Sequence, residues 1–247
     1  MTKAQKSFLG GAAVLAGAGL VVKILGAVFR IPLLYIVGSE GIGLFTMVYP
    51  IFTFLLVAST AGLPVAVSRM VAAEIALGNH KGAHKVFTTA MKLLVGLGLV
   101  TSLIMFAGSG LISAMQGNPK TVRVLQSLAP SLFLVAVISA YRGYFQGMQI
   151  MTPTALSQVV EQAGKLVFGL LLAAAWIPMG PEYGATGAMV GVTLSEVAAL
   201  VLLVGIYMGR RKGIMENIQS NPGAKEQSTK SILTKIIRIA VPVTLGA

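Results

Sequence analysis

Two positively charged residues interrupt the first long apolar stretch of the sequence. Lys23 and Arg30 lie within residues 8–37, where nearly all other side chains are apolar or small. In a helix, a spacing of seven residues places both on one face, about 10 Å apart along the axis. Because a cation surrounded by hydrocarbon is costly, this face is predicted to line a water-filled cavity that binds an anionic ligand. The alternative is that both are structural residues, paired or extended toward the membrane surface.

Three further ionisable residues interrupt later apolar stretches. Glu161 and Lys165 are four residues apart, with the acid before the base, which is the order that favours pairing within one helix. Glu196 lies in the middle of another apolar stretch, where it either pairs with Lys23 or Lys165 or binds a proton or a sodium ion. We therefore place Lys165 among the cavity cations and assign Glu161 and Glu196 to ion coupling or charge pairing; for Glu161 and Lys165 a purely structural pair is the favoured interpretation.

Other charged residues lie near the ends of apolar stretches, where anchoring at the cytoplasmic membrane interface is predicted: Arg69, Glu74, Lys92 and Arg142. His80 and His84 have the spacing of a metal clip, but no carboxylate accompanies them, so no metal site is predicted. The sequence contains no nucleophile elbow, phosphate-binding loop or HExxH motif. We therefore expect neither an enzyme nor a bound cofactor.

The composition indicates what positions these residues. Of 247 residues, 55% are hydrophobic and 11% are charged, and the mean hydropathy is +0.85. Such a chain is typical of a membrane protein, because a soluble core cannot absorb so much apolar surface. The predicted fold is an all-α, polytopic membrane helix bundle with six transmembrane helices, near residues 8–37, 42–77, 86–115, 121–147, 152–176 and 183–208. Kinks are predicted at Pro50 and at residues 62–64 of the second helix.

Three segments are predicted from this pattern: residues 1–208 form a six-helix lobe, 209–235 a basic cytoplasmic linker, and 236–247 the start of a seventh helix, too short to cross a bilayer. The alternative for the last segment is a short interfacial helix. Most basic residues fall on the side of the N-terminus, which is therefore predicted to be cytoplasmic. The net charge of +12 is assigned to this bias and to membrane lipids, and no nucleic-acid partner is expected.

Several motifs resemble a known family: residues 23–32 (KILGAVFRIP), 41–50 (GIGLFTMVYP), 59–68 (STAGLPVAVS) and 141–162 (YRGYFQGM, then MTPT and EQ). They are similar to the polysaccharide biosynthesis and stage V sporulation protein B family of lipid-linked oligosaccharide flippases. These proteins are relatives of lipid II flippases within the multidrug, oligosaccharidyl-lipid and polysaccharide exporter superfamily. The resemblance implies a protein about twice as long, with two six-helix lobes facing a central cavity, of which this chain is the N-terminal half.

The resemblance also implies that first-helix cations meet the lipid-linked diphosphate. Lys23 matches this role by its motif, and Arg30 is offset by one residue from the family pattern. The lipid II flippases also carry an arginine in the second span, where this chain has Thr-Phe-Leu-Leu at residues 53–56.

These observations together predict a protein of the bacterial cytoplasmic membrane that moves an anionic lipid-linked oligosaccharide across it by alternating access. The process served would be cell-wall, spore-cortex or polysaccharide synthesis. Its predicted partners are that lipid-linked substrate, membrane lipids and a second lobe. Two alternatives remain: a cation-coupled multidrug extruder of the same superfamily, and a non-transporting membrane scaffold.

Overall fold

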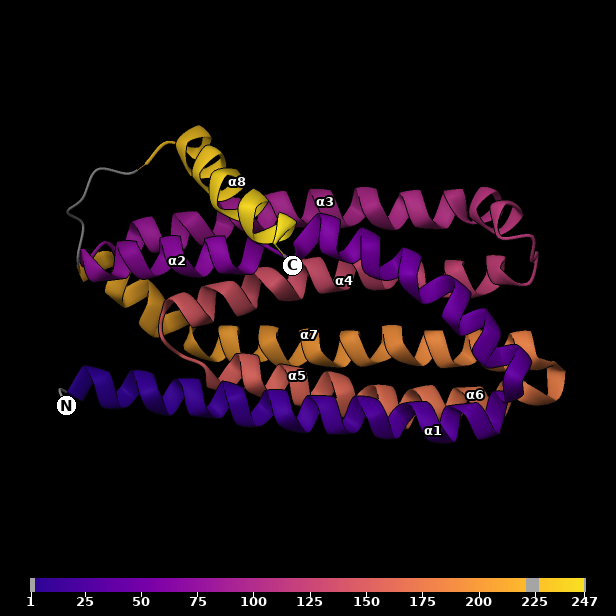
Figure 1. The fold of residues 1–247 in the computed structure, drawn as a ribbon. Coiled ribbons are helices and arrows are strands. Elements are labelled where there is room, and N and C mark those ends of the chain that lie inside the picture. Colours follow the sequence, from indigo (N-terminus) through magenta and orange to yellow (C-terminus); the bar gives the residue numbers. More distant parts are fainter. Residues whose placement is uncertain (1–2, 221–226, 247) are drawn as a thin grey trace.

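The computed structural model describes residues 3–220 and 227–246, and these residues form helices and short turns without any strand (Figure 1). The first helix, α1 (Lys3–Thr60), reverses direction at Gly38, whose backbone has φ 67° and ψ −175°. Glycine adopts this conformation without the steric cost that a Cβ atom would add. The turn predicted at residues 38–41 is therefore present, and α1 consists of two antiparallel passages.

The second passage is interrupted at residues 61 and 62 and continues as α2 (Leu63–Ala76). The predicted break at residues 62–64 is confirmed, with Pro64 in the first turn of α2, where its missing N–H costs no hydrogen bond. Pro50 lies inside α1 and does not take α1 out of helical dihedral angles. The break therefore comes where glycine and proline act together.

Four further passages follow. They are α3 (His80–Met115), α4 (Thr121–Gly147), a composite passage and α7 (Pro181–Ser220). The composite passage joins α5 (Thr152–Gly164), the π-helical turn η1 (Lys165–Gly169), α6 (Leu170–Trp176) and the 3-10 turn η2 (Ile177–Met179).

Five stretches of the described residues are long and apolar enough to cross a membrane, and the first covers Gly10–Ala76. As a straight helix, its 67 residues would extend about 100 Å, three times the thickness of a hydrocarbon core. The reversal at Gly38 divides this stretch into two passages, so the described ranges contain six. The predicted all-α membrane bundle is confirmed.

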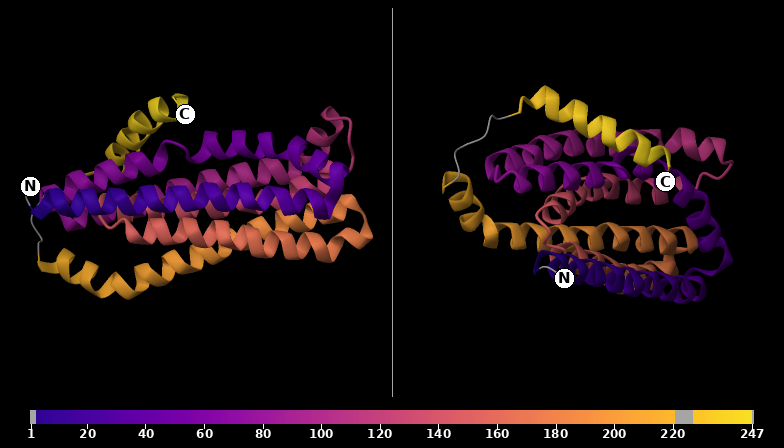
Figure 2. Two further views of the ribbon diagram at one scale, coloured as in Figure 1. Left: turned by 60° about the horizontal axis from the view of Figure 1, so that its bottom comes forward. Right: turned by 60° about the vertical axis from the view of Figure 1, so that its left-hand side comes forward.

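The helices form two layers (Figures 1 and 2). The first half of α1 lies beside α5 and α6, which pack against α7, while α2 and α3 pack against α4. The second half of α1 crosses from one layer to the other, and α4 contacts α7 between them. Leu125, Leu128 and Leu132 of α4 are completely buried at this central contact, which holds the layers together.

The last two helices differ from the predicted boundaries. α7 continues to Ser220, so residues 209–220 of the predicted linker are helical, and α8 (Thr229–Leu245) begins before the predicted residue 236. The middle of the linker, residues 221–226, lies outside the described residues. α8 packs along α2, where the N–H of Gly62 donates a hydrogen bond to Oγ1 of Thr244 at 3.1 Å.

One interface prediction is wrong because of this packing. Glu74 is 5% exposed and accepts hydrogen bonds from Nδ2 of Asn79 at 2.6 Å and from Nε2 of Gln227 at 2.5 Å. The first contact secures the turn between α2 and α3, and the second ties the start of α8 to it. The Glu74 carboxylate therefore accepts hydrogen bonds that hold these segments together, rather than anchoring the helix at the membrane surface.

Candidate functional site

A cavity of about 350 Å³ lies between the two halves of α1, the composite passage and α7. Its lining is mainly apolar and aromatic, with a few polar groups, as in many ligand sites. Among the described residues, its charged members are Arg30 from the first passage and Lys165 from η1, and none of its lining side chains is a carboxylate. The lining residues are Gly26, Phe29, Arg30, Leu33, Ile42, Phe45, Thr46, Tyr49, Pro50, Phe52, Gln162, Lys165 and Val192.

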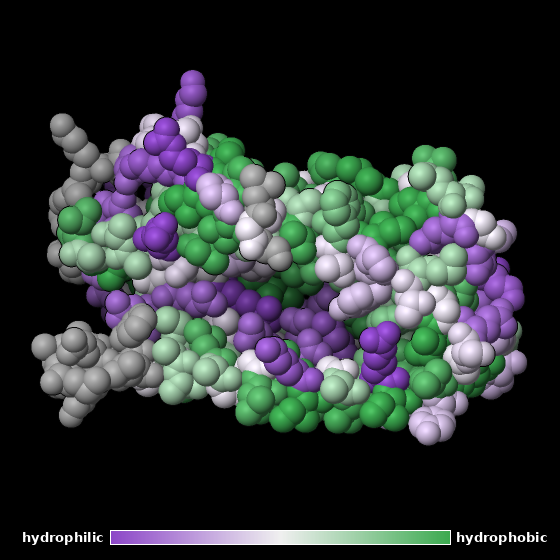
Figure 3. Space-filling view, in the orientation of Figure 1, coloured by the Kyte–Doolittle hydropathy of each residue, from purple (hydrophilic) through white to green (hydrophobic). Residues whose placement is uncertain are grey.

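The cavity lies away from the turns at this end of the bundle. Arg30 precedes the turn at Gly38 by eight residues, or about 12 Å of helix, and Lys165 precedes the turn at Gly180 by fifteen residues, or about 22 Å. Both cations therefore lie within apolar membrane-spanning passages rather than at the turns that connect them. In the orientation of Figure 1, a hydrophilic furrow runs along the middle of the molecule, bordered by hydrophobic surface (Figure 3).

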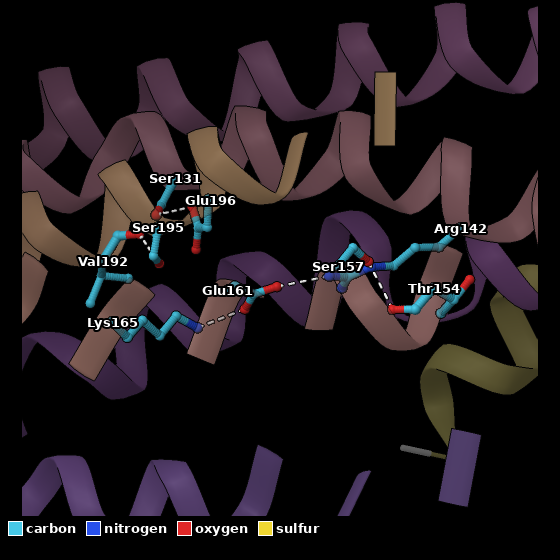
Figure 4. Close-up of polar contacts among 9 residues, drawn as sticks. All are labelled: Ser131, Arg142, Thr154, Ser157, Glu161, Lys165, Val192, Ser195 and Glu196. Atoms are coloured by element: carbon cyan, nitrogen blue, oxygen red, sulfur yellow. Dashed lines mark hydrogen bonds and ion pairs between the residues drawn. The ribbon is translucent and has the colours of Figure 1, made fainter. Parts of the chain in front are cut away.

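Three charged residues form a partly buried ion-pair cluster that shares Lys165 with the cavity: Arg142, Glu161 and Lys165 (Figure 4). Lys165 Nζ is 2.7 Å from Glu161 Oε1, and Arg142 Nη2 is 3.0 Å from Glu161 Oε2. Arg142 Nε also donates to Ser157 Oγ at 2.9 Å. The three charged side chains are 14%, 13% and 19% exposed, respectively. One carboxylate thus pairs with two cations, and the cluster keeps a formal charge of +1.

The π-helical turn explains how Lys165 reaches both the cluster and the cavity. Such a turn inserts an extra residue into a helix and is frequent at functional sites. It is accommodated because α7 approaches it with a glycine: a Cβ atom on Gly191 would lie 2.4 Å from the backbone of Gly169. Likewise, a Cβ atom on Gly164 would lie 2.7 Å from Cβ of Ser195. These glycines let backbones meet where any side chain would separate them.

Glu196 forms a second polar centre on α7. It is 1% exposed, and its carboxylate accepts a hydrogen bond from the hydroxyl of Ser131 on α4. Ser131 Oγ lies 3.5 Å from Thr193 Oγ1, which donates to the carbonyl of Ser127 at 3.0 Å. Within the part of the chain that the structure describes, Glu196 has no ion pair, so the predicted pairing with Lys23 or Lys165 is not observed. Its partner is a hydroxyl.

The structure brings some of the predicted site residues together. Arg30 and Lys165 share the cavity, and the predicted pair of Glu161 and Lys165 is present. Lys23 is exposed, two turns before Arg30, and is not among the residues that line the cavity. Neither Lys23 nor Arg30 has a hydrogen-bond or ion-pair partner within residues 3–220 and 227–246.

The two arginines predicted at the membrane interface differ. Arg69 on α2 is exposed, as an anchor would be. Arg142 points into the bundle and pairs with Glu161, five residues before the end of α4, and its predicted place at the cytoplasmic interface stays a prediction. The spacing of nineteen residues between Arg142 and Glu161 carries no local signal, because the contact joins two helices. Ser157 also accepts a hydrogen bond from Arg142. Its spacing of four residues from Glu161, which places both on one face of a helix, was the one signal in the sequence for this contact.

The histidines are placed apart from this site. His84 packs against the rings of Phe87 and Tyr144, with centroids 6.0 Å and 6.3 Å away. Among the described residues, no group of three or more histidine, cysteine, aspartate or glutamate side chains is arranged to hold a metal ion.

Comparison with solved structures defines the class of fold. The chain superimposes on a crystal structure of MATE in the straight conformation with a TM-score of 0.82 and 18% identity, over 97% of this chain and 52% of that one. The protein is therefore a polytopic membrane helix bundle whose fold matches about half of that structure. Residues 8–246 match the family described as polysaccharide biosynthesis protein, and the chain belongs to this family.

Two relatives come from Bacillus subtilis (strain 168). Stage V sporulation protein B is 31% identical over 247 residues, covering 98% of this chain and 46% of the relative. Lipid II flippase MurJ is 30% identical over 254 residues, covering 96% of this chain and 46% of the relative. The chain thus spans about half the length of both relatives. By its name, the second relative is a flippase, which is a transporter rather than an enzyme.

Proposed function

We propose that this chain is one lobe of a bacterial membrane flippase that moves an anionic lipid-linked sugar, such as a polyprenyl diphosphate oligosaccharide, by alternating access. The observation that carries the proposal is the cavity: in the part of the chain that the structure describes, its cations are Arg30 and Lys165, and no carboxylate lines it. Cations within membrane-spanning passages suit an anionic group, and transporter sites typically lie inside the membrane between such passages. A second lobe would close the open side of the cavity.

The ion-pair cluster supports this proposal by making Lys165 releasable. When Lys165 turns toward a diphosphate, Glu161 keeps Arg142 as its partner at 3.0 Å. A lone Glu161–Lys165 pair would instead leave an unpaired buried carboxylate, which is strongly unfavourable. Arg30, which has no partner among the described residues, would make the first contact with the anion. We assign the diphosphate to these two cations, and Lys23 to its approach.

We assign Glu196 to ion coupling, with Glu161 as the second candidate. Glu196 is buried on α7 and its hydrogen-bond partner Ser131 belongs to α4, at the contact between the layers. Binding of a proton or a sodium ion there would alter a contact between the two layers. Relative movement of packed helices is a common element of alternating access.

The proposed orientation has a cytoplasmic N-terminus. The end of the bundle that holds the N-terminus also holds the turn between α2 and α3 and the end of α7, where Arg210, Arg211 and Lys212 follow one another (Figure 1). At the opposite end, the cations Lys120 and Arg123 are each paired with a glutamate. The positive-inside rule then assigns the first end to the cytoplasm.

The multidrug alternative requires a different cavity. A cationic drug would be attracted by carboxylates, and Glu161, which pairs with the cavity residue Lys165, is already shared by two cations. A scaffold that does not transport remains the second alternative, and it makes no use of Arg30.

The proposal is tested by charge-neutralising variants. Arg30→Gln and Lys165→Gln should each weaken binding of a fluorescent undecaprenyl diphosphate disaccharide to the purified chain by about tenfold or more, because hydrogen bonds to charged groups contribute about 1.5–3 kcal/mol. Lys92→Gln is the matched control, since Lys92 is an exposed cation on α3 outside the cavity.

Flipping is then measured with the full-length protein in proteoliposomes, where Arg30→Gln should reduce transport of the same lipid. Unchanged binding in both cavity variants would refute the site. Stronger binding of a cationic dye than of the lipid would instead favour the multidrug alternative.

A further inference from the structure

The cavity contains an aromatic group that the diphosphate does not need. Phe45 and Tyr49 stack with ring centroids 5.0 Å apart and an interplanar angle of 13°, and Phe52 lies 6.0 Å beyond Tyr49. All three line the same cavity as Arg30 and Lys165. Phe52 is buried in the core, whereas Tyr49 remains 45% exposed. Tyr49 is therefore an aromatic surface that is supported from behind and open toward the cavity.

Uncommitted polar groups accompany this aromatic surface. Within residues 3–220 and 227–246, the side-chain amide of Gln162 has no hydrogen-bond partner, although it lines the cavity. Thr46 donates its hydroxyl proton to the carbonyl of Gly43 at 2.8 Å, which leaves its oxygen free to accept. The amide and the hydroxyl thus provide a donor and acceptors within the same cavity as the ring of Tyr49.

A ligand that matches these groups has an apolar face, hydroxyl or amide groups at its edge, and an attached anion. Diphosphate alone satisfies only the cations, and a hydrocarbon chain satisfies only the rings. A pyranose satisfies both, because its axial C–H groups form an apolar face that stacks on aromatic rings while its hydroxyls lie in the ring plane.

We propose that Tyr49, backed by Phe45, is the platform on which a sugar ring of the transported lipid stacks, with Gln162 and Thr46 bonding to its edge. This inference rests on the proposed function, since Arg30 and Lys165 hold the diphosphate next to the sugar. Tyr49 thereby determines specificity for a glycosylated over a bare polyprenyl diphosphate.

The test compares two probes on the purified chain: undecaprenyl diphosphate, and undecaprenyl diphosphate linked to an N-acetylhexosamine disaccharide. Tyr49→Leu removes the ring and keeps an apolar side chain, and it should weaken binding of the glycosylated probe by roughly three- to tenfold while leaving the bare probe unchanged. Tyr49→Phe keeps the ring and should retain most of the preference. Tyr35→Leu is the matched control, because Tyr35 is on the same helix, is 85% exposed and does not line the cavity.

The outcomes separate this inference from the proposed function. If Tyr49→Leu weakens both probes equally or neither, the sugar platform is refuted, whatever the cation variants show. If Arg30→Gln and Lys165→Gln leave both probes unaffected, the diphosphate site fails first. If Tyr49→Leu loses its helical circular dichroism, Gln162→Leu is measured in its place. This variant should likewise weaken binding of the glycosylated probe and leave binding of the bare probe unchanged. Tyr49 as a contact for a second lobe predicts no difference between the probes.

Discussion

Replacement of Glu161 by glutamine tests whether one carboxylate holds two cations. Glu161 binds Lys165 at 2.7 Å and Arg142 at 3.0 Å, and all three side chains are less than 20% exposed. Removal of the shared partner leaves two buried cations uncompensated, whereas removal of Lys165 leaves a complete pair of Glu161 and Arg142. Glu161→Gln should therefore be more destabilising than Lys165→Gln.

The magnitudes follow from the number of charges left without a partner. Breaking a buried pair costs about 3–5 kcal/mol, so Glu161→Gln should lower the unfolding temperature by about 6–20 °C at this chain length. Lys165→Gln removes one charge-assisted hydrogen bond, which contributes about 1.5–3 kcal/mol. The double variant Glu161→Gln with Lys165→Met should recover part of the loss, because only one cation then remains uncompensated.

Thermal unfolding of the purified chain, followed by helical circular dichroism in one detergent at a fixed heating rate, measures this order. The fixed rate matters because unfolding of membrane proteins is commonly irreversible. Lys92→Gln, at an exposed position on α3, provides the baseline for loss of a cation. If Glu161→Gln unfolds at or above the temperature of Lys165→Gln, the shared-carboxylate argument is wrong.

Two further predictions concern the packing of α7 and the surface pairs. Gly191→Ala should destabilise the bundle by at least about 1–3 kcal/mol, because its Cβ would lie 2.4 Å from the backbone of Gly169. Gly205→Ala is the control: a Cβ there would have no atom within 4 Å, so the change should be neutral or stabilising by up to about 1 kcal/mol. Equal unfolding temperatures of the two variants would contradict this prediction. The second prediction concerns the hydrogen bond of 2.5 Å from Lys120 to Glu40, which raises the pKa of Lys120 above 10.5. The contribution of this pair to the free energy of unfolding is therefore present below pH 10.5 and is lost only as the pH rises through the raised pKa. Since both side chains are about half exposed, at 50% and 51%, Lys120→Gln should leave the unfolding temperature nearly unchanged at physiological salt between about pH 6 and 9, and a large loss in that range would refute this.

The sequence by itself determined the membrane class, the number of passages and the local charge pair. Apolar stretches of hydrocarbon length predict helices that cross a bilayer, because no other solvent suits them. Gly38 predicted the first reversal, and the spacing of Glu161 and Lys165 predicted their contact. These features depend on residues close together in the chain, so they can be read without knowing how the helices pack.

Contacts between helices were decided only by the tertiary structure. Arg142 was expected at the membrane interface and pairs with Glu161 across two helices, while Glu74 is buried beneath the start of α8. Each of these contacts depends on the rotation of one helix about its long axis relative to its neighbour. A sequence specifies which residues share a face of one helix, but not which helix that face meets.

The cavity and its π-helical turn also depend on how the helices pack against one another. Arg30 and Lys165 are far apart in the sequence, and they line one cavity because α1 packs against α5 and η1, while α7 approaches η1 closely at Gly191 and Gly169. Glycines mark possible close contacts, yet many glycines in the chain have nothing near them, so their positions alone do not identify the partner. The sequence therefore determined which charges must avoid lipid, and the packing of α1, α5 and α7 decided which of them share a cavity.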